Sequence, residues 1–82
     1  MSNPHPTLAL SLALAGVLED VLKDEGISRL EAANRAGIPQ STLYRKLSGK
    51  TPFDVVELAS VARIAGRTPS DLLAVAERRA TA

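Results

Sequence analysis

The chain has 82 residues, which suits one small domain near the size at which a single core becomes marginal. Hydrophobic residues make up 45% of it, but with one Phe, one Tyr and no Trp the core must be built from Leu, Val, Ile and Ala, which favours packed helices over sheets. The absence of cysteine excludes disulfides, thiolate nucleophiles and zinc-thiolate sites, and it favours a reducing cytoplasm as the compartment.

The net charge of +1 conceals an uneven distribution. Residues 29–50 carry five bases against one acid, a local charge of +4, whereas residues 8–25 carry four acids against one base, a local charge of −3. We therefore expect one side of the domain to attract a polyanion and the other not to. A generic solvated surface is the alternative interpretation.

Residues 1–7 are predicted to form a flexible arm, because they place prolines in a polar context. A first helix should then run from about Leu8 to Glu25 and stop at Gly26. Its apolar stretch is too short to span a bilayer, so no membrane association is expected. Leu8 and Leu12 fall outside the core face, either as scatter or as a contact with a second chain. The expected core face consists of Leu10, Leu14, Val17, Leu18, Val21 and Leu22.

Two short helices joined by a tight turn are predicted between residues 28 and 50. Ser28 and Glu31 have capping-box spacing, so the inner helix should start near Arg29. Leu30, Ala33 and Ala36 would form its apolar face, with the small Ala32 and Ala33 allowing close packing. Gly37 would supply the positive φ that ends this helix, and Ile38 would follow as a buried anchor.

The outer helix is expected at about residues 39–48, with Pro39 in its first position and Gly49 closing it. At about 100° per residue, Leu43 and Leu47 point one way. The opposite face is polar and basic, and it carries Ser41, Arg45 and Ser48. This arrangement suits a helix that inserts into the major groove of DNA.

The pattern A-A-x-x-A-G-I-P-x-S-T-L-x-x-x-L-x-G-K resembles the helix-turn-helix of the phage lambda repressor and Cro class, the XRE family. Ala33, four positions before the turn glycine, and Leu43, six after it, match that family's small and apolar positions. Its third anchor, generally Ile or Leu, is Lys46 here, with Leu47 next to it. The resemblance covers about residues 10–76. It implies an all-α, compact five-helix bundle of the lambda-repressor type.

The last two helices are marked by repeated Thr-Pro starts. Thr51-Pro52 predicts a mostly enclosed helix over about residues 52–65, whose apolar face includes Val55. Thr68-Pro69 predicts another over about residues 69–79. The helix-turn-helix DNA-binding domain would thus occupy residues 8–79, followed by a C-terminal tail at 80–82. The resemblance also implies that Leu73 or Val75 lies in a dimer contact, although intramolecular packing explains them equally well.

No site for catalysis is expected. The single histidine, His5, lies in the predicted arm, and the sequence has no phosphate-binding loop, zinc-protease motif or nucleophile elbow. The sequence therefore predicts a protein that is not an enzyme, with no catalytic or metal-binding residues, no cofactor and no small-molecule ligand.

Double-stranded DNA is the expected partner. Gln40 can pair with an adenine edge, as the resemblance also implies, and Arg45 can reach the two acceptors of guanine. The predicted base-reading residues are Gln40, Ser41, Thr42, Tyr44 and Arg45. Phosphate contacts would position the domain without reading sequence, and the residues predicted to make them are Arg29, Lys46, Ser48, Lys50 and Thr51.

The resulting hypothesis is a sequence-specific transcriptional regulator, most like a phage or prophage repressor or Cro protein, that acts in the cytoplasm and is a homodimer at least on DNA. A dimer is expected because one small domain makes few contacts. One alternative is an excisionase-like architectural factor. Another is an antitoxin or anti-repressor, a protein-binding module whose exposed Leu8 and Leu12 meet a partner.

Overall fold

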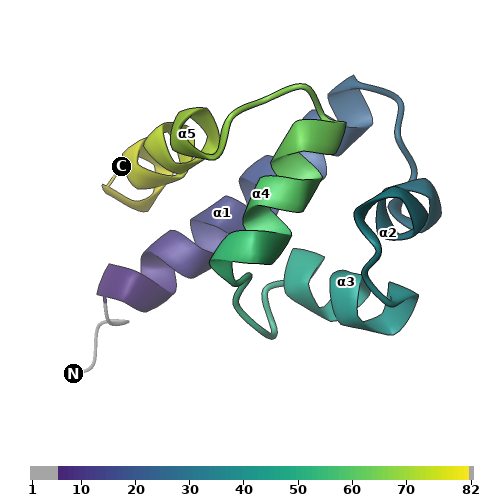
Figure 1. The fold of residues 1–82 in the computed structure, drawn as a ribbon. Helices are drawn as coiled ribbons and strands as arrows, with labels where there is room; N and C mark the ends of the chain where they lie inside the picture. The colour runs from purple at the N-terminus through teal and green to yellow at the C-terminus, as the bar shows by residue number, and fades with distance from the viewer. Residues whose placement is uncertain (1–5, 82) are drawn as a thin grey trace.

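The computed structural model describes residues 6–81, which form five helices and no strand. In Figure 1, α1 runs behind α4, with α5 on one side and α2 and α3 on the other. The all-α, five-helix prediction is therefore confirmed. The helices are α1 (Pro6–Asp24), α2 (Arg29–Ala36), α3 (Gln40–Leu47), α4 (Val55–Ile64) and α5 (Pro69–Thr81).

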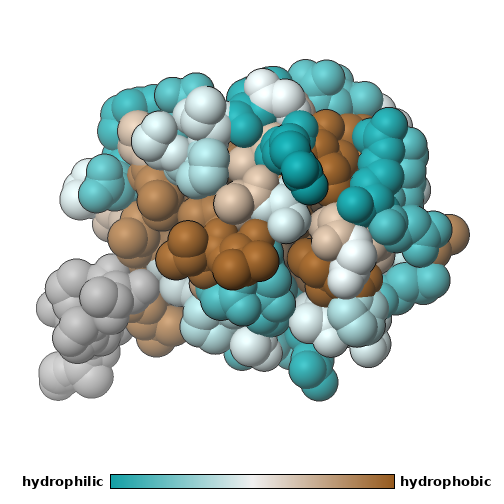
Figure 2. All heavy atoms as spheres, viewed as in Figure 1, coloured by the Kyte–Doolittle hydropathy of each residue, from teal (hydrophilic) through white to brown (hydrophobic). Residues whose placement is uncertain are grey.

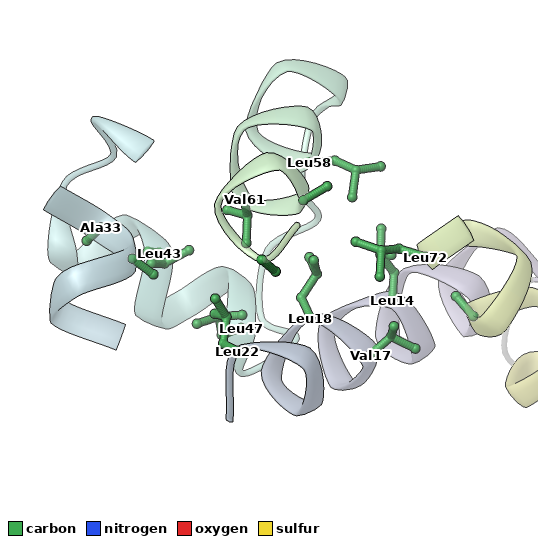
Figure 3. Close-up of a cluster of buried hydrophobic side chains, with 14 residues drawn as sticks. Leu14, Val17, Leu18, Leu22, Ala33, Leu43, Leu47, Leu58, Val61 and Leu72 are labelled. Atoms are coloured by element: carbon green, nitrogen blue, oxygen red, sulfur yellow. The ribbon is translucent and has the colours of Figure 1, made fainter. Parts of the chain in front are cut away.

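A single apolar core joins the helices. Leu18 in the middle of α1 is fully buried, and side chains from α3, α4 and α5 gather around the same helix (Figure 3). The predicted face of α1 is confirmed, since Leu14, Val17, Leu18 and Leu22 are buried while Leu10 and Val21 pack against them. Within residues 6–81 no helix combines the length and apolarity needed to cross a membrane.

The helix boundaries correct the sequence analysis at both ends of the chain. Helix α1 starts at Pro6, so Pro6 and Thr7 belong to a helix and not to the predicted arm, whose residues 1–5 lie outside the described part. Helix α5 extends through Ala80 to Thr81, whose hydroxyl donates to the Glu77 carbonyl at 3.0 Å. Two residues of the predicted tail are thus helical.

The start of α4 was predicted three residues too early. Asp54 Oδ1 accepts the Glu57 amide at 2.7 Å, and Glu57 Oε1 accepts the Asp54 amide at 2.9 Å. This reciprocal capping box stabilises a helix that begins at Val55, so Thr51 and Pro52 lie in the preceding loop. Nor is the first turn enclosed, because Val55 is 80% exposed and Val56 74% exposed.

Candidate nucleic-acid interface

The turn between α2 and α3 is built by the backbone of Gly37. Gly37 has a φ of 70°, the left-handed conformation that ends a helix at low cost only for glycine. The Ile38 amide then donates to the Ala33 carbonyl at 3.0 Å, and Ala32 and Ala33 are fully buried, which allows α2 to pack closely. Leu30, by contrast, is 46% exposed, so its predicted place on the apolar face is wrong.

Helix α3 is held by two leucines and leaves its other side open. Leu43 is fully buried and Leu47 is 5% exposed, as predicted, and both point into the core in Figure 3. Pro39 is the N-cap, so the helix begins at Gln40 and not at the predicted Pro39. Gln40, Ser41 and Arg45 are all exposed. Three of the five predicted base-reading side chains thus lie on the solvent side of a firmly anchored helix.

The other two predicted base-reading residues are less open. Thr42 is half-buried, and Tyr44 is 38% exposed with the Arg29 guanidinium 5.5 Å from the centre of its ring. This cation–π contact covers part of the tyrosine ring from the α2 side. Arg29 also forms a two-pronged ion pair with Glu19 of α1, at 2.9–3.1 Å. Its charge is therefore partly neutralised before any phosphate approaches.

Lys46 occupies the third anchor position, where it is paired with an acid of the same chain. Its side chain is only 11% exposed, and its ammonium forms an ion pair with Glu57 of α4, itself 18% exposed. A phosphate contact by Lys46 would require its ammonium to leave Glu57, so this contact stays a prediction. Within the chain, the stem packs as an apolar anchor would, while the ammonium ties α3 to α4. Glu57 was missed by the sequence analysis, although the D-x-x-E capping spacing that positions it is visible there.

The remaining predicted phosphate contacts follow α3. Lys50 and Ser48 are exposed, and Thr51 is half-buried. The Ser48 hydroxyl donates to the Arg45 carbonyl at 2.8 Å and the Lys50 amide to the same carbonyl at 3.0 Å, so the end of α3 is well ordered by hydrogen bonds. Within residues 6–81, Arg45 and Lys50 are the basic residues of this motif that form no salt bridge.

The acids of the α1 region do not form the open negative face that the charge count suggested. Glu19 pairs with Arg29, Glu25 with Arg67 at 3.1 Å, and Asp20 with Arg79 at 2.9 Å. These pairs connect α1 to α2 and to α5, and the residue after α1 to the loop before α5. The local charge of −3 is therefore largely balanced across the bundle.

The predicted partner-contact residues divide into two that pack within the chain and two that are about half exposed. Leu73 and Val75 are partly buried and pack against the core. Leu8 and Leu12 are 49% and 47% exposed, which confirms that they lie outside the core face. Leu12, however, lies over the turn after α3, since a Cβ on Gly49 would come within 2.8 Å of its Cδ2 atom. The described residues contain no cluster of three His, Asp or Glu side chains placed to hold a metal, and His5 lies outside them.

Comparisons with known proteins agree with this geometry. The family model of the BetR domain, a helical DNA-binding regulator domain, matches residues 11–82. Among solved structures, the chain is similar to the clp gene regulator ClgR from Corynebacterium glutamicum, with a TM-score of 0.83 and 25% identity over 88% of this chain and 77% of that one. No curated protein matches the sequence. The matches support the predicted helical DNA-binding regulator and leave the finer assignment to the lambda repressor and Cro class a prediction.

Proposed function

We propose that this chain, which belongs to the BetR domain family, binds double-stranded DNA sequence-specifically by placing α3 in the major groove and thereby regulates transcription. The observation that supports this most directly is the division of α3 into two sides. Leu43 and Leu47 fix the helix from behind, so that Gln40, Ser41 and Arg45 face solvent at the outer surface of the domain.

The roles of the outward side chains follow from their chemistry. Gln40, at the start of α3, offers an acceptor and a donor to one adenine edge, and Arg45 offers two parallel donors to guanine. Ser41 lies between them along the helix and suits a shorter contact. Lys50, after the helix, suits a phosphate. Arg29 remains a candidate for the same strand, although it would have to share its guanidinium with Glu19.

The finer proposal is a repressor of the lambda and Cro type that occupies an operator as a homodimer. One copy presents a single eight-residue helix, and specific affinity normally requires two such helices on half-sites about one helical turn apart. A DNA site with two-fold symmetry is therefore expected.

Selection of bound sequences from random DNA at two salt concentrations tests the function. We expect a recurring symmetric site.

Arg45→Ala should lose discrimination at particular base pairs, by about 1–3 kcal/mol each. Lys50→Ala should weaken all sequences alike and reduce the salt slope by about one unit. Arg78→Ala, at an exposed position near the end of α5, is the matched control and should change neither. Equal effects of the Arg45 and Lys50 variants on every sequence would contradict these roles.

A further inference from the structure

The outward face of α4 carries the two most exposed large hydrophobic side chains of the described residues. Val55 and Val56 are 80% and 74% exposed, well above every other exposed large hydrophobic residue. Figure 2 shows an apolar area on the face toward the viewer, over the start of α4. A shallow hollow follows the same face along the helix, and it is lined by Val55, Val56, Ala59, Ser60 and Arg63.

Neither the core nor the helix itself accounts for this face. The opposite side of α4 already supplies the core through Leu58, Val61 and Ala62, which are buried. Two adjacent valines in a first helical turn also work against helix formation, because β-branched side chains lose rotamer freedom there. The capping box at Asp54 and Glu57 is what stabilises this start. The exposed valines are thus available to pack against an apolar surface of another molecule.

We propose that this face docks a second copy of the chain, with the two α4 helices antiparallel about a two-fold axis near Ala59. The inference rests on the proposed DNA-binding function, for which two copies are expected. An apolar face does not suit phosphates, whereas it suits an identical apolar face. A symmetric contact of this kind needs a surface that is complementary to itself.

Charges at the two ends of the face give it that complementarity. Val55 and Arg63 each lie four residues from Ala59, about 6 Å along the axis in opposite directions. In the antiparallel arrangement, Arg63 of one copy lies beside Val55 of the other, next to its Asp54. The Arg63 stem can then cover the valine while its guanidinium approaches the Asp54 carboxylate. Within residues 6–81 Arg63 forms no salt bridge, so its charge is available.

The small residues at the centre set the closeness and the strength of the contact. Ala59 and Ser60 allow the two helices to approach with little between their backbones. The apolar part of the face consists of two valines and an alanine, which falls short of the roughly 800 Å² per partner of a standard interface. The dimer should therefore be weak in solution and form mainly when adjacent half-sites on DNA bring two copies together.

Cysteine cross-linking tests the surface directly, because the full chain contains no cysteine. Ala59→Cys places one thiol at the proposed axis, where the two Cα atoms fall within disulfide range. Ser70→Cys, exposed at the first turn of α5, is the control, and Leu12→Cys tests the alternative face on α1. Under mild oxidation with the selected DNA, we expect Ala59→Cys to form covalent dimers at least about ten times faster than either of the other variants.

A second set of variants separates the surface from the fold. On the Ala59→Cys background, Val55→Ser with Val56→Ser should reduce cross-linking to the level of Ser70→Cys while helicity and DNA half-site binding persist. Unchanged cross-linking by this variant, or faster cross-linking of Leu12→Cys, would overturn the inference. The inference would also be overturned if Ala59→Cys binds DNA sequence-specifically but cross-links no faster than Ser70→Cys. If the wild-type chain selects no DNA sequence yet cross-links through position 59 at high protein concentration, the proposed function fails and the surface stands.

Discussion

The ion pair between Lys46 and Glu57 should fix the rotation of α3 about its own axis, and the two side chains should contribute to stability as a coupled pair. Both side chains are largely buried, at 11% and 18% exposure, and the Glu57 carboxylate also accepts the Asp54 amide at 2.9 Å. Removing one partner of a buried pair costs about 3–5 kcal/mol in unfolding free energy when the remaining charge cannot reach water. Here the lysine stem can swing its ammonium toward water, so the cost should be lower.

A double-mutant cycle measures the coupling. Glu57→Gln keeps an acceptor for the Asp54 amide but leaves the Lys46 ammonium facing a neutral amide, and we expect a loss of about 1–2 kcal/mol. Lys46→Met keeps the packed stem and should cost about 1 kcal/mol. The double variant removes both charges and should cost less than about 1 kcal/mol in total, a coupling of at least about 1 kcal/mol. Urea unfolding followed by helicity provides the free energies.

Two results would refute this reasoning. Additive costs, within about 0.3–0.5 kcal/mol, would mean that the two side chains stabilise the fold independently. In the DNA-binding assay, Lys46→Met should leave the salt dependence unchanged, unlike Lys50→Ala. A salt slope that falls by about one unit in Lys46→Met would mean that Lys46 leaves Glu57 and contacts a phosphate on DNA, as its sequence position suggested.

Three further predictions concern stability, and thermal unfolding checks all of them. Gly37→Ala should cost about 1–2 kcal/mol from left-handed strain alone, because an added Cβ there meets nothing within 4 Å. Gly49→Ala should cost about the same, because the atom that its Cβ would approach, Leu12 Cδ2 at 2.8 Å, ends a side chain that is 47% exposed and can turn aside; a larger cost that Leu12→Ala removes would contradict this. Leu43→Ala should cost about 2–5 kcal/mol as a fully buried leucine, whereas Leu30→Ala, at a 46% exposed position, should cost much less.

The local parts of the fold could be predicted because their causes lie within a few residues. Ser28 accepts the Glu31 amide at 3.0 Å, and Gly37 turns the chain with a positive φ, both as their spacing indicated. Thr68 likewise accepts the Asp71 amide at 3.2 Å at the start of α5. The two leucines of α3 were predicted from helical period alone. Each of these signals acts through the backbone or one helix face, so no knowledge of the tertiary structure is required.

Features that depend on neighbouring helices were not predictable in the same way. Two capping signals competed before α4, and the Asp54 box prevailed over Thr51-Pro52 because Glu57 makes it reciprocal. Leu30 is exposed although its helix is amphipathic, and the residues that α2 buries are Ala32 and Ala33. The role of Lys46 depends on an acid eleven residues later, and a count of charges along the chain does not reveal such pairs.

These ion pairs change how the domain should hold DNA. Counted along the sequence, the motif has five cations, but Arg29, Arg35 and Lys46 are paired with acids of the same chain. The field toward a polyanion therefore comes mainly from Arg45 and Lys50. With so few free charges, one copy gains little from counterion release, which is the main source of affinity that does not depend on sequence. A single domain should consequently bind DNA only weakly. A second copy joined through α4 would double both the free cations and the base-reading side chains. For that reason, we expect the apolar face of α4 and the polar face of α3 to contribute together to DNA binding.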